Sequence, residues 1–132
     1  MKITRNSRRH ERPRVKGLIH YTLDSNPSLS HLKDICEVSE SGLSFLTDTK
    51  IPPGTRLKAS LRLLSREAPF GVYAIVLRCV LKKKTPASYL VSLYFIDMSD
   101  KDRDELRGLL LSLLKKRDGI KPFDFVIRLN PY

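Results

Sequence analysis

The sequence is poor in the residues that build metal and catalytic centres. It contains no tryptophan, two cysteines and three histidines among 132 residues. Cys36 and Cys79 lie in separate apolar runs without the C-x-x-C spacing of a zinc site, and the histidines are scattered along the chain. We therefore expect two buried free thiols and neither a metal site nor a histidine-based catalytic centre.

Long hydrophobic runs are also absent. No stretch approaches the roughly 20 apolar residues that a membrane-spanning helix needs. The opening residues, MKITRNS, lack the apolar core of a secretory signal. The sequence therefore predicts a cytoplasmic protein without a membrane span. With 41% hydrophobic and 30% charged residues, a chain of this length suits one soluble domain with a modest core.

Acidic residues are outnumbered. The chain has 25 lysines and arginines against 14 aspartates and glutamates, a net charge of +11. Such a field attracts nucleic acids, acidic proteins, anionic membranes and small phosphorylated ligands alike, so charge alone leaves the ligand open. The first 16 residues concentrate the basic side chains, with Glu11 as their single acid.

Short apolar stretches separated by turn residues predict a β-rich fold. The expected strands are residues 15–23, 29–39, 43–47, 57–64, 71–81 and 89–96. Because no helix separates them, they predict a mainly β protein, a small antiparallel six-stranded β-barrel.

The second expected strand has an irregular pattern. Leu32, Cys36 and Val38 are its apolar residues among polar neighbours, and Ile35 falls out of phase with them. This predicts a β-bulge or an edge that is buried on both faces.

The sequence ends its β-rich part with a predicted amphipathic α-helix. Ser99 can cap the first turn, acids follow it, and Gly119 is a natural stop. Its apolar stripe consists of Leu106, Leu109, Leu110, Leu113 and Leu114. We expect the stripe to pack on the barrel, with a partner helix or a dimer as the alternative.

These patterns divide the chain into four parts. We expect a flexible basic arm at 1–16, the barrel at 17–98, the helix at 99–118 and a tail at 119–132. The tail could add a strand to an edge, dock across the barrel or stay loose, and the sequence does not choose among these.

The basic arm carries an R-x-x-x-R pattern formed by Arg8 and Arg12, with Arg9 as a third guanidinium. A guanidinium makes bidentate hydrogen bonds with phosphate or with guanine O6 and N7, and its flat face stacks on a base. By itself the pattern is weak and is more typical of a solvated basic arm with no defined ligand.

A second pattern lies at 37–42, with the sequence EVSESG. Glu37 and Ser39 should share one face of a strand, so that a carboxylate and a hydroxyl lie together. A carboxylate can accept from N1–H and N2–H₂ of guanine. Gly42 permits a close backbone approach or a positive φ. The two patterns together predict an anion and guanine site.

This pairing resembles the PilZ domain family, small bacterial β-barrels that bind cyclic di-GMP. The stretch 89–99, followed by the acid-rich helix, is similar to the last strand and C-terminal helix of that family, and the likeness covers about 8–117. It implies ligand contacts from Arg8, Arg9, Arg12, Glu37, Ser39 and Gly42. The family has Asp or Asn where this chain has Glu37, and the extra methylene should weaken binding roughly tenfold.

The resemblance implies a bacterial receptor for cyclic di-GMP that changes conformation and signals to an unidentified protein partner, and not an enzyme. It requires no cofactor and no metal, and it leaves oligomerisation open. One alternative is a PilZ-fold adaptor that has lost nucleotide binding. A second is a basic barrel that binds nucleic acid, which is disfavoured because only 8% of the residues are aromatic and most lie in apolar phases.

Overall fold

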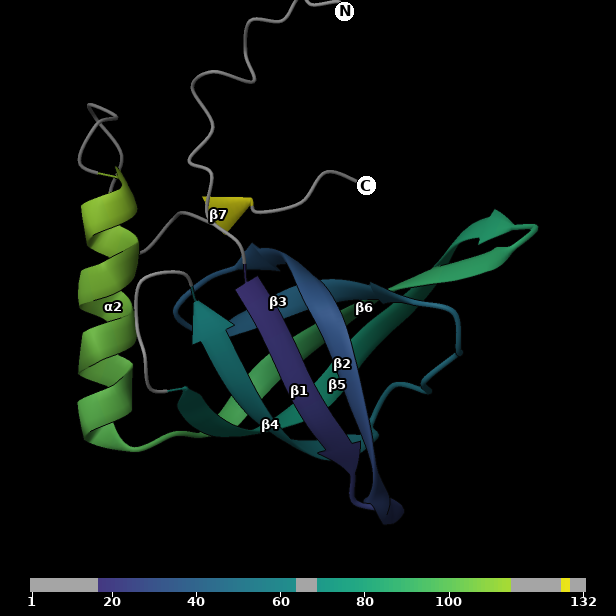
Figure 1. Cartoon of the computed structure of the whole chain (residues 1–132), viewed down its shortest axis with the longest axis horizontal. Helices are drawn as coiled ribbons and strands as arrows, with labels where there is room; N and C mark the ends of the chain where they lie inside the picture. The colour runs from purple at the N-terminus through teal and green to yellow at the C-terminus, as the bar shows by residue number, and fades with distance from the viewer. Residues whose placement is uncertain (1–16, 64–68, 115–126, 129–132) are drawn as a thin grey trace, which may run out of the picture.

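The structure of the protein is a computed structural model that describes residues 17–63, 69–114 and 127–128. Long antiparallel strands curve around one core and a helix stands beside them (Figure 1). The elements are β1 (Gly17–Leu23), β2 (Asn26–Val38), β3 (Gly42–Thr47), β4 (Arg56–Leu63), β5 (Phe70–Lys84), β6 (Ala87–Asp97), α2 (Asp100–Leu114) and β7 (Ile127–Arg128).

Pairing between β1 and β2 closes the sheet into a barrel. The strand order is β1-β4-β5-β6-β3-β2, and β2 returns to β1. This confirms the predicted six-stranded antiparallel barrel with a C-terminal helix. The 39–41 turn and the start of β1 lie at one end, which we call the 39–41 end. The β1–β2 turn and the β3–β4 connection lie at the other, which we call the 24–25 end.

The barrel core follows the alternation that the sequence predicts. In β4 the inward residues Leu57, Ala59, Leu61 and Leu63 are at most 4% exposed, while the residues that alternate with them are exposed or only partly covered. A strand with one face in the core and one in water gives this period of two. Burial of the apolar face is the main favourable contribution to the barrel.

A bulge interrupts β2 at the place that the sequence indicated. Ile35 pairs with Phe45 but Glu37 pairs with Ser44, so Cys36 is the extra residue. An extra residue reverses the phase of the strand. Leu32 was therefore assigned to the wrong face, because it precedes the bulge and its side chain is 61% exposed.

The β5–β6 hairpin is longer than predicted. We expected β5 to end at Leu81, but it continues to Lys84, which pairs with Ala87. Pairing between β4 and β5 stops at Ile75, so the rest of the hairpin extends beyond the barrel (Figure 1). Because it lies partly outside the core, Cys79 is only half-buried, and its expected burial was wrong.

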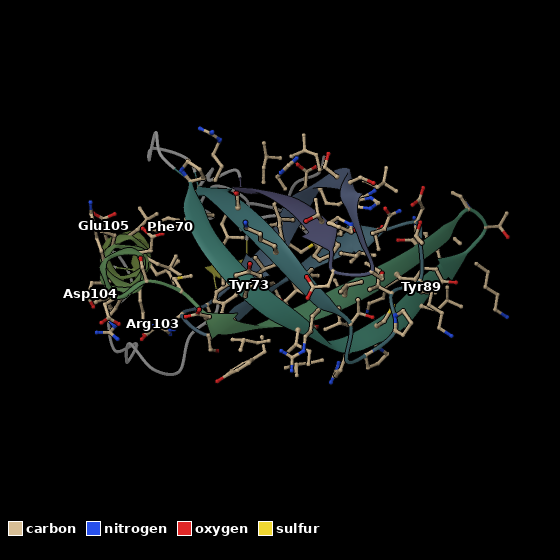
Figure 2. All side chains as sticks on the ribbon, turned by 90° about the horizontal axis from the view of Figure 1, so that it is seen from below. Phe70, Tyr73, Tyr89, Arg103, Asp104 and Glu105 are labelled. Atoms are coloured by element: carbon tan, nitrogen blue, oxygen red, sulfur yellow. The ribbon has the colours of Figure 1, made fainter. Side chains whose placement is uncertain are left out.

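Helix α2 packs on the barrel through the first three leucines of the predicted stripe, while the side chains of Leu113 and Leu114 lie outside the described part of the structure. The Ser99 hydroxyl accepts a hydrogen bond from the Asp102 amide at 3.1 Å and caps the first turn. Leu106 and Leu110 are fully buried in the barrel core. Figure 2 shows Phe70, which belongs to the same core, between the helix and the strands. No helix in the described part of the chain is long and apolar enough to cross a membrane.

The short strand β7 adds to the edge of β2. Ile127 pairs with Val38 and Arg128 pairs with Glu37. The pairing of β2 with β1 ends at Asp34, so β7 takes the edge that β1 leaves open. For these two residues, the edge strand is the correct one of the three alternatives for the tail.

Candidate functional site

The structure brings together the three described residues of the predicted site. Glu37, Ser39 and Gly42 border one groove at the 39–41 end, with a volume of about 190 Å³. The arginines of the basic arm, Arg8, Arg9 and Arg12, lie outside the described residues. The groove is also lined by Ser41, Leu43, Ser44, Leu77, Ser92, Leu93 and Tyr94.

Glu37 lies near the end of β2, opposite Ser44 of β3. Its side chain is half-buried, and the Ser44 hydroxyl donates a hydrogen bond to Glu37 Oε1 at 3.5 Å. Ser44 is only 5% exposed. A neighbour that is itself fixed in the barrel therefore helps to orient the carboxylate toward the groove.

Ser39 organises the turn that follows β2. Its amide donates to the Gly42 carbonyl at 2.8 Å, and its hydroxyl accepts from the Ser41 amide at 3.3 Å. β2 ends at Val38, so the strand alternation that placed Ser39 with Glu37 stops one residue earlier. The turn still directs both residues into the same groove.

Gly42 is required by a close approach between strands. It is buried and pairs with Tyr94 of β6. A β-carbon at this position would collide with the carbonyl oxygen of Leu93. Among the described glycines, only Gly54 has a positive φ. Of the two reasons that the sequence offered for this glycine, the close approach is therefore correct.

Two groove residues escaped the sequence prediction. Leu77 of β5 and Tyr94 of β6 are 53% and 49% exposed, and both border the groove. Tyr94 lies between the buried Leu93 and Phe95, so its outward phase was readable from the sequence. The outward phase of Leu77 was not readable from the sequence, because Leu77 lies at a register shift between β5 and β6. Together they give the groove a hydrophobic wall with one aromatic ring, which suits stacking against a base.

The turn is also tied to the helix. Arg107 of α2 donates from Nη2 and Nε to Glu40 Oε2, at 2.7 and 3.0 Å. The bonded Glu40 carboxylate raises the pKa of Arg107. The turn is held to β6 as well, because the Phe95 amide donates to the Ser41 carbonyl at 2.8 Å. The 39–41 turn is therefore anchored on two sides.

Metal ligands do not gather in this part of the molecule. Within residues 17–63, 69–114 and 127–128, no group of three histidine, cysteine, aspartate or glutamate side chains could hold a metal ion. What the groove does offer is hydrogen-bonding groups from Glu37, Ser39 and Ser41 and a flat ring from Tyr94.

The described part of the chain is a closed β-barrel with a groove at one end and a helix packed beside it. The family model of the PilZ domain matches residues 6–112. The chain therefore belongs to the PilZ domain family.

Solved structures with the same fold share little sequence with this chain. The K. pneumonia MrkH–c-di-GMP complex is 19% identical, with a TM-score of 0.65 over 80% of this chain and 49% of MrkH. The inhibitor of motility MotI/DgrA of Bacillus subtilis is 16% identical, with a TM-score of 0.63 over 80% of this chain and 50% of MotI. The chain thus spans about half the length of either protein.

A third similar structure is of one domain. The PilZ domain with c-di-GMP of YcgR from Escherichia coli is 18% identical, with a TM-score of 0.52 over 80% of this chain and 89% of that domain. No curated protein matches the chain.

Proposed function

We propose that this PilZ domain is a receptor for cyclic di-GMP and not an enzyme. The observation that carries the proposal is the groove in which Glu37, Ser39 and Gly42 meet. The family match and the similar structures of MrkH and of the YcgR PilZ domain with c-di-GMP support this ligand.

In the proposed complex, a guanine base enters the groove. The Glu37 carboxylate accepts hydrogen bonds from N1–H and N2–H₂, and the Ser39 hydroxyl adapts as donor or acceptor. The ring of Tyr94 offers a flat surface for the base. Gly42 lets the backbone of the turn lie close to β6.

The arginines of the basic arm complete the site in this proposal. Arg8, Arg9 and Arg12 bind phosphate oxygens or guanine O6 and N7, and they offset the charge of the two phosphates. Gly17 begins β1 at the same end of the barrel as the 39–41 turn. Arg12 precedes it by five residues, a span of about 17 Å when extended. In this proposal the arm closes over the groove.

Signalling follows from this arrangement. A ligand that bridges the arm and the barrel fixes the arm against the 39–41 end and changes the surface there. An unidentified protein partner then distinguishes the bound from the free surface. In this role the domain acts by conformational change in the cytoplasm.

Calorimetric titration of the full chain with cyclic di-GMP tests the proposal. We expect saturable binding that is lost in Arg12→Ala and Arg8→Ala and kept in Arg56→Ala, which removes an arginine from the opposite barrel end. Cyclic di-AMP should bind far more weakly because its base lacks O6. A folded protein that gives no heat at about 100 µM ligand would contradict the proposal.

A PilZ-fold adaptor without nucleotide binding is the second candidate. One residue favours it: Glu37 stands where the family has Asp or Asn, and its longer side chain projects farther into the groove. The adaptor binds neither nucleotide, whereas a nucleic-acid-binding barrel binds both weakly, with an affinity that falls steeply with salt. The same titration at two salt concentrations separates these outcomes.

A further inference from the structure

A second hollow opens at the 24–25 end of the barrel, and it shares no residue with the groove at the 39–41 end. Its volume is about 270 Å³. Strands β1 and β2 and the connection between β3 and β4 form its walls. Its apolar side includes Tyr21, Leu23 and Ile51, and its polar side includes His31, Lys33 and Lys50.

The polar side results from an inverted pattern in β2. His31 pairs with Tyr21 and Lys33 pairs with Ile19, and both β1 partners are buried in the core. Residues directly opposite each other in an antiparallel pair point to the same face. The two basic side chains are therefore directed to the inner side of the barrel, while Leu32 between them faces solvent.

As a result of this inverted pattern, Leu32 is not buried, and Lys33 occupies an inward position of the kind that apolar residues fill in the other strands. A lysine in such a position needs solvent or an anion for its charge. Local breaks in an otherwise consistent pattern occur mainly at functional or strained sites. The inner face of β2 before the bulge is therefore a candidate ligand surface.

The inner wall of the hollow is aromatic. The Tyr21 ring is 2% exposed and stacks on His31, with centroids 4.8 Å apart, and Phe45 lies 5.2 Å from it on the core side. Burial raises the pKa of the Tyr21 phenol, and a hydrogen bond with Thr47 partly offsets this. The phenol is therefore neutral at pH 7, so the wall carries no negative charge there.

The rim of the hollow is positively charged. Lys33 and Lys50 face one acid, Asp48, whose carboxylate accepts a hydrogen bond from the Thr49 hydroxyl at 3.0 Å. In the part of the chain that the structure describes, neither lysine forms a salt bridge. An anion at the rim would gain charge-assisted hydrogen bonds without breaking a described ion pair.

The connection that forms one side of the hollow is fixed before any ligand arrives. The Thr55 hydroxyl donates to the Pro52 carbonyl at 2.7 Å. The Gly54 amide donates to the Val76 carbonyl at 2.7 Å, and the Val76 amide donates to the Thr55 carbonyl at 2.9 Å. A preformed wall avoids part of the entropy cost of binding.

We propose that this hollow binds a small aromatic carboxylate, with its ring against the partly exposed His31 ring that covers Tyr21 and its carboxylate beside Lys33. A cavity of about 150 Å³ is known to hold benzene, so a hollow of this volume has room for one ring and an acid group. The site is independent of the nucleotide groove, and its test does not depend on the proposed receptor function.

Amide resonances of the full chain, followed by NMR during titration, test this site. The probes are benzoate, acetate, which lacks the ring, and benzylamine, which reverses the charge. We expect benzoate alone to shift Tyr21, Thr47 and Ile51 in a saturable way. Lys33→Met should weaken benzoate binding about tenfold. The matched control Lys58→Met, on the outer face of β4, should leave it unchanged.

Three results would each overturn the proposal. The first is the absence of shifts at about 10 mM benzoate with the protein folded. The second is an equal response to acetate or to benzylamine, because it would make the ring or the charge irrelevant. The third is unchanged benzoate binding in Lys33→Met, whose spectrum also reports whether the variant keeps the barrel fold.

Discussion

Glu40 and Arg107 join the 39–41 turn to helix α2 through two hydrogen bonds on one carboxylate oxygen. Glu40 lies between Ser39 and Ser41, which line the groove. A shift of the turn on ligand binding therefore acts directly on the helix. The Arg107 side chain is 43% exposed, so the pair contributes little energy and weakens as salt rises.

We predict that Arg107→Gln lowers the affinity for cyclic di-GMP about twofold to fivefold, because the turn loses one of its two anchors. Glu40→Gln should have a similar effect, and the double variant should be no weaker than either single one, since the two side chains act through each other. Calorimetric titration measures all three.

Arg103→Gln serves as the matched control, because it removes an arginine from the same helix without touching the turn. Additive losses in the double variant would contradict the coupling of turn and helix.

Two glycines should respond in opposite ways to the same substitution. Gly42→Ala places a β-carbon against the Leu93 carbonyl and should lower the free energy of unfolding by about 1–3 kcal/mol. Gly108→Ala lies in helix α2, where the new methyl group meets nothing within 4 Å apart from its own helix backbone, and should raise it by about 0.5–1 kcal/mol. Urea unfolding followed by circular dichroism measures both. A neutral Gly42→Ala would show that β3 and β6 can separate at this point.

The sequence predicted the features that depend on local patterns. The alternation of β4 and the cap at Ser99 follow from neighbouring residues, and both were correct. The predicted face of Leu32 was wrong because the bulge at Cys36 reverses the in-out alternation of the β2 residues that precede it. Groove residues Leu77 and Tyr94 come from strands that follow the motif by more than 30 residues, so only the sheet register brings them to it.

The two cysteines should differ in reactivity. Cys36 is buried, and burial raises the pKa of its thiol, so little thiolate forms near neutral pH. Cys79 is only half-buried in the hairpin that extends from the barrel. At pH 8 a disulfide reagent should label one thiol in the native protein and both in denaturant. Cys79→Ser should abolish the native reaction, and fast labelling of that variant would contradict the assignment.

The raised pKa of Tyr21 gives stability a dependence on alkaline pH. Its phenol holds its proton more tightly in the folded state than the ordinary pKa of 10.0 would allow. This contribution is complete below that pH and is lost as the pH rises toward the folded pKa. We predict that Tyr21→Phe loses less stability than the parent protein between pH 9 and pH 11. Urea unfolding of both proteins at several pH values in this range measures the difference. Equal losses of stability in the two proteins would contradict the prediction.

Glu37→Asp is the substitution that bears most directly on the receptor proposal. It keeps the carboxylate and withdraws it by one methylene, to the length that the family pattern contains. The Ser44 hydroxyl reaches Glu37 only at 3.5 Å, so shortening the side chain gives up little of that contact. We therefore expect Glu37→Asp to bind cyclic di-GMP about tenfold more tightly than the parent, and Glu37→Ala to bind more weakly than both.

The control for this series is Asp34→Glu, an opposite change in length at an exposed position of the same strand, which should leave the affinity unchanged. If Glu37→Asp binds cyclic di-GMP and the parent does not, the groove is a nucleotide site that one methylene has closed, and the native protein acts as an adaptor. If neither binds while both stay folded, the carboxylate has no role in guanine recognition, and the receptor proposal fails.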